Sequence, residues 1–178
     1  MSYSKDDLLF APLGGSGEIG MNVNLYHFRD SWIMVDLGIS FPDESTPGVD
    51  IILPDLKFIA DRREKLAGLV LTHAHEDHFG AIPYLWSQIG CPIYGTAFTI
   101  ALLRRKLSES RAALDIPLHE IGMNAPFNLG SFEIEMVALN HSIPDPAALA
   151  IRTDAGTILH TGDWKFDETP VLGRDTDR

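Results

Sequence analysis

The chain has 178 residues, of which 45% are hydrophobic and 22% charged, a composition typical of a globular domain with its own core. This composition excludes an intrinsically disordered chain and a collagen-like repeat, and no apolar run reaches the ~18 residues of a membrane-spanning helix. The first residues also lack the apolar segment of a signal peptide. The net charge of −11 argues against nucleic-acid binding through a basic face, although carboxylates that hold divalent cations contribute to this charge.

Strand-like and helix-like segments alternate along the first two thirds of the chain. We expect strands over residues 8–13, 22–28, 32–36, 68–72 and 92–94. We expect helices over residues 55–66, 79–88 and 96–108, the last with Thr96 as its N-cap. Residues 37–54 contain three prolines and several acidic residues and predict a long loop.

The last third of the chain is strand-like. Short apolar runs at residues 131–139, 148–153 and 157–161 are separated by glycine and proline, which predicts three more strands. Strands that alternate with helices and are followed by further strands predict a layered α/β sandwich. The single cysteine, Cys91, excludes an internal disulfide and fits a protein of the reducing cytoplasm.

A glycine-rich motif, Gly15-x-Gly17-x-x-Gly20, follows the first predicted strand and matches a dinucleotide-binding fingerprint. That fingerprint requires a helix and then a crossover to a parallel strand. Only ten residues separate Gly20 from Ser31, and they alternate in polarity like a strand. Nucleotide binding is therefore disfavoured, and the motif is either a flexible turn between two strands or a loop that borders a site.

The strongest chemical signal is His73-Ala74-His75-Glu76-Asp77-His78, which directly follows the predicted strand 68–72. Burying so many imidazoles and carboxylates without partners would cost several kcal/mol, so the alternatives are a solvated polar loop and a metal site. On a loop at a strand end, His73 and His75 can bind one cation while Asp77 and His78 reach a second. Imidazole nitrogen combined with carboxylate oxygen suits zinc or manganese better than calcium.

Two further donors follow later strands. His141 lies after residues 131–139, and Asp163 follows Gly162 at the end of the strand 157–161. A lone histidine in such a position is usually structural, but the cluster upstream leaves a ligand position for His141. The carboxylate of Asp163 could bridge two cations.

The remaining candidates have weaker support. Asp36 ends the strand 32–36 and is either a turn residue or a partner that orients a ligand histidine. His160 lies close to Asp163 in sequence and is either its neighbour around the metal ligands or a packed strand residue. His27 and His119 have no expected role.

The residues above, in the order Asp36, His73-x-His75-x-Asp77-His78, His141 and Asp163, resemble the metallo-β-lactamase superfamily. Longer blocks resemble the RNase J group of β-CASP nucleases within it; these blocks are residues 14–22, 35–42, 71–78, 140–145 and 160–167. The resemblance implies an αββα sandwich, of α+β class, with a metal site at one edge. It also implies a metal-dependent ribonuclease, a 5′-to-3′ exonuclease with additional endonuclease activity, in RNA processing and decay.

The resemblance assigns a role to each candidate. His73, His75 and His141 would bind the first metal, and Asp77 and His78 the second, with Asp163 as the bridge. Asp77, His78 and Asp163 would be the catalytic residues, around two zinc ions or their manganese or magnesium substitutes. Ser142 and Lys165 are candidates for contacts with the substrate phosphate. RNA would be the partner, with a homodimer or homotetramer as the assembly and no membrane association.

Two departures from the family pattern limit these expectations. No histidine follows Asp163 to complete the second metal site, and the β-CASP insertion is absent. We therefore expect residues 1–168 to be an incomplete metallo-β-lactamase domain, and residues 169–178 a linker towards the missing β-CASP domain. A thioesterase or lactonase of the same fold, and a non-catalytic metal-binding fragment, remain as alternatives.

Overall fold

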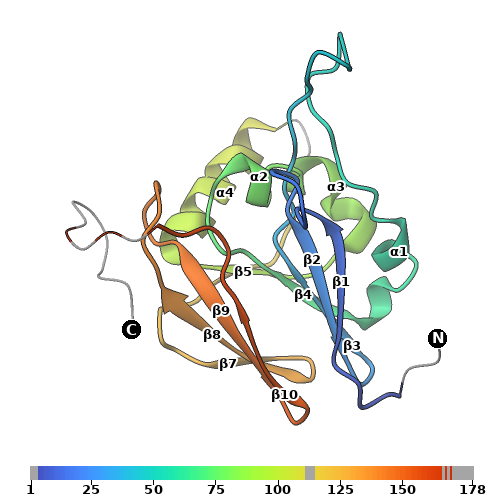
Figure 1. Ribbon diagram of the computed structural model, residues 1–178, viewed down its shortest axis with the longest axis vertical. Helices are drawn as coiled ribbons and strands as arrows, with labels where there is room; N and C mark the ends of the chain where they lie inside the picture. Colours follow the sequence, from blue (N-terminus) through green and yellow to red (C-terminus); the bar gives the residue numbers. More distant parts are fainter. Residues whose placement is uncertain (1–3, 111–114, 166, 168, 170–178) are drawn as a thin grey trace.

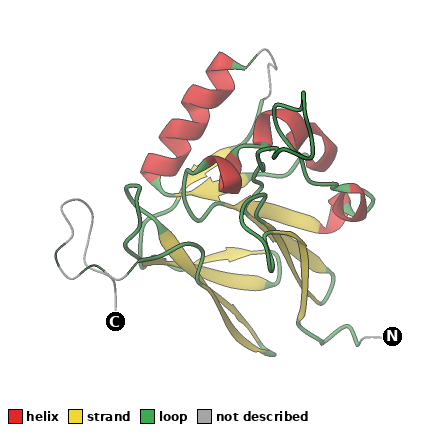
Figure 2. Ribbon diagram, turned by 45° about the horizontal axis from the view of Figure 1, so that its top comes forward, coloured by secondary structure: helices red, strands yellow, loops and turns green. Residues whose placement is uncertain are grey.

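The structure is a computed structural model that describes residues 4–110, 115–165, 167 and 169. It consists of a layer of helices, a six-stranded sheet and a four-stranded sheet (Figures 1 and 2). In the described part of the chain, the helices lie on one side only, against the larger sheet. The predicted linker over residues 169–178 lies, apart from Thr169, outside the described residues.

The six-stranded sheet has the order β1-β2-β3-β4-β5-β6. Its strands are β1 (Leu9–Gly14), β2 (Val23–Phe28), β3 (Ser31–Val35), β4 (Leu66–Val70), β5 (Ile93–Gly95) and β6 (Leu118–Glu120). The four-stranded sheet has the order β10-β9-β8-β7. Its strands are β7 (Phe127–Leu129), β8 (Phe132–Ala138), β9 (Ala147–Thr153) and β10 (Gly156–His160).

The first two predicted helices are shorter in the structure than the sequence predicts. The expected helix over residues 55–66 is a single turn, α1 (Lys57–Ala60), followed by the 3₁₀ turn Arg63–Lys65. Leu66 pairs with Trp32 in the parallel ladder, so the strand begins earlier than predicted and the helix cannot continue. The expected helix over residues 79–88 is observed as α3 (Ile82–Ile89), and a separate single turn, α2 (Glu76–Phe79), begins within the histidine cluster, where the sequence predicts a loop.

The predicted helix over residues 96–108 is observed as α4 (Ala97–Glu109). The Thr96 side chain accepts a hydrogen bond from Thr99 N, so Thr96 is the N-cap. Among the described residues, none of these helices is long and apolar enough to cross a membrane.

Two hydrophobic cores hold the layers together. One lies between the helices and the six-stranded sheet and includes Leu25, Leu69 and Ile82. The other lies between the two sheets and includes Phe132 and Leu149. Strand β9 contributes alternate residues, Ala147, Leu149 and Ile151, to this second core.

The topology brings the predicted donors to one edge. Strands β3 and β4 are parallel, so both end at the same side of the large sheet. In the small sheet, β8 and β10 both pair antiparallel with β9 and therefore also run in one common direction. Asp36, the histidine cluster, His141 and Asp163 follow the carboxyl ends of these strands, the usual place for ligand-binding residues in an α/β sheet.

The inter-sheet core yields a stability prediction. Leu149 is fully buried, whereas Leu159 on the neighbouring strand is 62% exposed. We expect Leu149→Ala to lower the free energy of unfolding by about 2–5 kcal/mol, because it leaves a cavity between the sheets. Leu159→Ala is the matched control, with an expected change of about 0.5 kcal/mol or less. Urea unfolding followed by circular dichroism measures both, and equal losses would contradict the assignment of this core.

Candidate metal centre

Three imidazoles converge beyond the ends of β4 and β8. His73 Nε2 lies 3.0 Å from His75 Nδ1, and His141 Nε2 lies 3.2 Å from the same His75 nitrogen. Ligand atoms that share a tetrahedral zinc ion lie about 3.3–3.4 Å apart, because each bond is about 2.0–2.1 Å long. The three nitrogens therefore fit one cation, and we call these residues the first donor group.

His78 is at the centre of a second set of donors. Its Nε2 atom lies 3.5 Å from an oxygen of Asp77 and 3.6 Å from an oxygen of Asp163. We call Asp77, His78 and Asp163 the second donor group. His73 lies at the boundary between the groups, because its ligand atom is also within 4.8 Å of those of His78 and Asp163.

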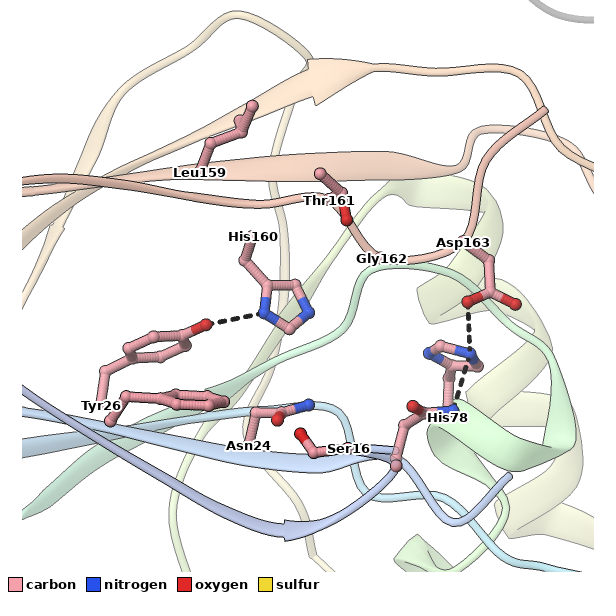
Figure 3. A pocket seen from close by; sticks show the side chains of 12 residues that line it. Ser16, Asn24, Tyr26, His78, Leu159, His160, Thr161, Gly162 and Asp163 are labelled. Carbon is pink, nitrogen blue, oxygen red and sulfur yellow. Dashed lines mark hydrogen bonds and ion pairs between the residues drawn. The ribbon is translucent and has the colours of Figure 1, made fainter. Parts of the chain in front are cut away.

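The Asp163 carboxylate lies between the two groups. One of its oxygens faces His78 Nε2, and the other lies 3.7 Å from His141 Nε2. Figure 3 shows this side chain on the segment after β10, directed towards His78. Because the carboxylate has one oxygen towards each group, its position suits a ligand that bridges two cations.

A buried carboxylate contacts His78 at Nδ1, the ring nitrogen on the side away from the other donors. Asp36 is fully buried, and its Oδ2 atom lies 2.7 Å from His78 Nδ1. Thr72 donates to the same carboxylate through its backbone N–H and through its hydroxyl, each at 2.8 Å. Since Nδ1 of His78 is engaged by Asp36, Nε2 is the nitrogen that faces the second donor group.

Residues 73–79, which we call the metal-binding segment, are also held by contacts from the loop after β3 and from α4. Leu37 N donates to His78 O at 2.7 Å, and Ile39 N donates to Glu76 O at 3.1 Å. From α4, Lys106 Nζ lies 2.8 and 2.7 Å from the two carboxylate oxygens of Glu76. Helix α2 therefore holds its donors in place before any cation binds, which is the preorganisation that a metal site requires.

Most of the donors have the protonation state that a cation needs. Burial, together with the charge of His78, lowers the pKa of His73 to about 3. Burial and the neighbouring His75 also lower the pKa of His141. The hydrogen bond with His78 lowers the pKa of Asp163 to about 2. At neutral pH these groups are neutral imidazoles and a carboxylate, the forms that bind metal.

His78 is the exception. Burial alone would lower its pKa, but the carboxylates of Asp36 and Asp163 outweigh burial and raise the pKa to about 10. Without a cation, His78 therefore carries a proton at neutral pH. A cation that binds Nε2 must displace this proton, so metal binding at the second group is coupled to proton release.

Other predicted residues lie outside the two donor groups. His160 Nδ1 lies 2.8 Å from the Tyr26 hydroxyl, in the cavity that also borders the second donor group (Figure 3). Ser142 is exposed on the segment after β8. Lys165 Nζ forms an ion pair with Asp167 at 2.9 Å. The phosphate contacts of Ser142 and Lys165 stay predictions.

Two residues that contact the donors are not singled out by the sequence. Thr72 immediately precedes His73 at a strand end, so its position could have indicated a supporting role. Asn22 donates from its side-chain amide to Asp77, which is 55 positions away. Nothing local in the sequence links Asn22 to the metal-binding motif, because only the folded sheet brings the two together.

The family model of the β-lactamase superfamily domain matches residues 32–175, which include all the donors described above. The chain belongs to the β-lactamase superfamily. The crystal structure of the metallo-β-lactamase fold protein YhfI from Bacillus subtilis is similar, with a TM-score of 0.62 at 18% identity, over 89% of this chain and 64% of that chain. This likeness confirms the predicted α+β metallo-β-lactamase fold.

Curated relatives confirm the predicted resemblance to the RNase J group. Ribonuclease J of Sinorhizobium meliloti is 47% identical over 97% of this chain and 31% of its own length. Ribonuclease J of Helicobacter pylori is 44% identical over 98% of this chain and 25% of its own length. The chain therefore spans less than a third of the length of these curated relatives.

The raised pKa of His78 gives a pH prediction for the metal-free chain. A folded-state pKa of about 10, against an ordinary value of 6.5, contributes stability that is fully present below pH 6.5 and is lost as the pH rises through 10. We expect the His78 imidazole resonance to remain that of the protonated ring at pH 8 in the presence of chelator. In Asp36→Asn, the largest raising interaction is lost, so the pKa of His78 should fall and the ring should lose its proton at a lower pH than in the wild type. A wild-type resonance that titrates near pH 6.5 would contradict this assignment.

Proposed function

We propose that the chain provides the metal centre of a metal-dependent ribonuclease of the RNase J type. The observation that carries this proposal is the pair of donor groups with the Asp163 carboxylate between them. Pairs of cations about 3.5–4 Å apart are typical of nucleases and phosphatases. The relatives at 47% and 44% identity that are named Ribonuclease J support the choice of a nuclease.

The residues of the chain would place the reacting groups. When bound, the cations would lower the pKa of a water molecule to about 7 and stabilise negative charge on the phosphate oxygens. The first cation would be held by His73, His75 and His141, the second by Asp77 and His78, and both by Asp163. Asp77, His78 and Asp163 are the proposed catalytic residues, and Asp36 would keep His78 Nε2 directed at the cation.

Zinc is the proposed metal, with manganese or magnesium as substitutes. The donors are imidazole nitrogens and carboxylate oxygens, which zinc and manganese accept readily. The low pKa values of His73 and Asp163 support this choice, because both donors are free of protons at neutral pH. The carboxylates among the donors also account for part of the negative charge of the chain.

RNA is the proposed substrate, with 5′-to-3′ exonucleolytic and additional endonucleolytic cleavage. Ser142 and Lys165 are proposed to contact the phosphate, since they lie on the segments that carry His141 and Asp163. The proposed location is the cytoplasm, which the one buried cysteine, Cys91, supports. A homodimer or homotetramer is the proposed assembly of the protein, with residues 1–168 as its metallo-β-lactamase domain.

Two other functions compete with this proposal. A thioesterase or lactonase would use the same donor groups on a small substrate. A non-catalytic metal-binding role is favoured by the composition of the second donor group, which within the described residues consists of one imidazole and two carboxylates besides the shared His73. Turnover of RNA compared with that of a thioester separates these functions.

Substrate preference tests the proposed activity. We expect the full-length protein, loaded with zinc or manganese, to cleave 5′-monophosphorylated RNA and to leave a thioester intact. Both reactions are measured under the same conditions, with Sinorhizobium meliloti Ribonuclease J as the positive control for RNA. Thioester cleavage without RNA decay would reject the nuclease. If the 178 residues alone match the control on RNA, the non-catalytic role is excluded.

Replacing the bridging carboxylate tests the role of Asp163. We expect Asp163→Ala to abolish cleavage and to weaken both cations together, by about 10- to 100-fold or more. His78→Ala should weaken only the second cation, and His119→Ala, which removes a ring stacked on Tyr94, should weaken neither. Metal affinities from chelator competition and RNA turnover are the measurements. Near-normal turnover in Asp163→Ala would refute the bridge.

Metal content distinguishes the two donor groups. The first group offers three imidazoles within contact distance of one another, whereas the second depends on His78 losing its proton. We therefore expect the purified chain to retain about one zinc ion per molecule, which chelator removes, and to bind a second only at higher zinc concentration. Atomic emission spectroscopy before and after chelation gives the ratio. Two tightly held ions in the purified chain would contradict this order.

A further inference from the structure

The glycine-rich turn that resembles a nucleotide fingerprint lies beside the second donor group. It joins β1 to β2, which pair antiparallel, so the helix and crossover of a nucleotide-binding unit do not follow it. Gly15, Ser16 and Asn22 line a cavity of about 310 Å³ together with His78 and Asp163 (Figure 3). The proposed ribonuclease mechanism assigns no role to this turn.

Asn22, directly after the turn, contacts both donors that come from α2. Its Nδ2 atom lies 3.1 Å from His78 Nε2 and 3.4 Å from Asp77 Oδ2. The same amide donates to Asp77 O at 3.1 Å. The Asn22 backbone N–H also donates to Asp77 O, at 2.8 Å, and its carbonyl accepts from Gly38 N at 3.1 Å. One residue therefore fixes the main chain of the metal-binding segment and touches the ligand atoms of Asp77 and His78.

The glycine at position 15 makes room for this amide. A Cβ atom at Gly15 would lie 2.3 Å from Asn22 Oδ1, which no real contact permits. At Gly17 a Cβ atom would meet nothing within 4 Å, although both glycines have a φ of +81°. Both positions therefore carry the backbone conformation that favours glycine, but only Gly15 is in contact with Asn22.

We propose that the glycine-rich turn leaves room for the Asn22 amide beside Asp77 and His78, and that this amide positions Asp77 and His78 as ligands of the second cation. The inference rests on the second donor group of the proposed function. In the metal-free chain, the amide donates to Asp77 O and Oδ2 and lies against the protonated His78 Nε2, so it holds Asp77 next to the His78 ring. A cation then meets donors that are already ordered, so less conformational entropy is lost on binding. Asn22 is thus a positioning residue, and the turn is its support.

Two glycine substitutions test the inference on the 178-residue chain. Gly15→Ala and Gly17→Ala introduce the same backbone strain, but only Gly15→Ala displaces the Asn22 side chain. Zinc is titrated while the histidine ring resonances are followed by NMR, with His78 reporting on the second donor group and His75 and His141 on the first. In Gly15→Ala we expect the zinc concentration for half-saturation at His78 to rise by about 10-fold or more, with less than about a twofold change at the first group. Gly17→Ala should bind like the wild type at both groups.

A second pair of variants removes the amide itself and serves if Gly15→Ala does not fold. Asn22→Leu keeps the size of the side chain without its hydrogen bonds, and Asn24→Leu makes the same change two residues further along, at another residue that lines the cavity. We expect the selective loss of zinc affinity at His78 in Asn22→Leu and not in Asn24→Leu. Wild-type affinity at His78 in Asn22→Leu, or equal losses at both donor groups, would overturn it and leave the proposed function standing. A wild-type His78 that does not respond to zinc would instead reject the second metal group, and with it the proposed two-metal function.

Discussion

The contact between the buried carboxylate of Asp36 and the His78 imidazole is the interaction on which the rest of the site depends. Asp36 is fully buried, and burial by itself would raise its pKa, but the adjacent His78 outweighs burial and lowers it. The residue has a φ of +62°, a conformation that costs energy for any residue other than glycine. Its hydrogen bonds with Thr72 and His78 over-determine that conformation, and they are what a buried charge requires if it is not to destabilise the fold.

From this contact the site extends through the topology of the two sheets. The ends of β3 and β4 supply Asp36 and the histidine cluster, and the ends of β8 and β10 supply His141 and Asp163. The two sheets must keep their spacing for His141 to reach His75 and for Asp163 to reach His78. The inter-sheet core, packed around residues such as Phe132 and Leu149, therefore supports the candidate metal centre, although it contains none of its donors.

The sequence predicts which donors come together, and the structure brings them together, but the sequence does not predict the contacts that support them. The cluster from His73 to His78 follows an apolar strand, and this local pattern was enough to predict converging donors. The short helix α1 could not be predicted, because the pairing of Leu66 with Trp32 decides where the helix stops. Likewise, the contact between Asn22 and Asp77 depends on how β2 lies against the metal-binding segment. The motif Gly15-x-Gly17-x-x-Gly20 matches a nucleotide-binding fingerprint, but it is a turn between β1 and β2 that borders the candidate metal centre. This is one of the two alternatives that its sequence leaves open.

The arrangement of two unequal donor groups around Asp163 is tested most directly by zinc anomalous diffraction from crystals of the chain. At moderate zinc concentration, we expect one strong peak among the nitrogens of His73, His75 and His141. At higher concentration we expect a second, weaker peak between Asp77 and His78, with the Asp163 carboxylate reaching both. A single peak centred on His78, or zinc bound away from His75 and His141, would contradict this arrangement.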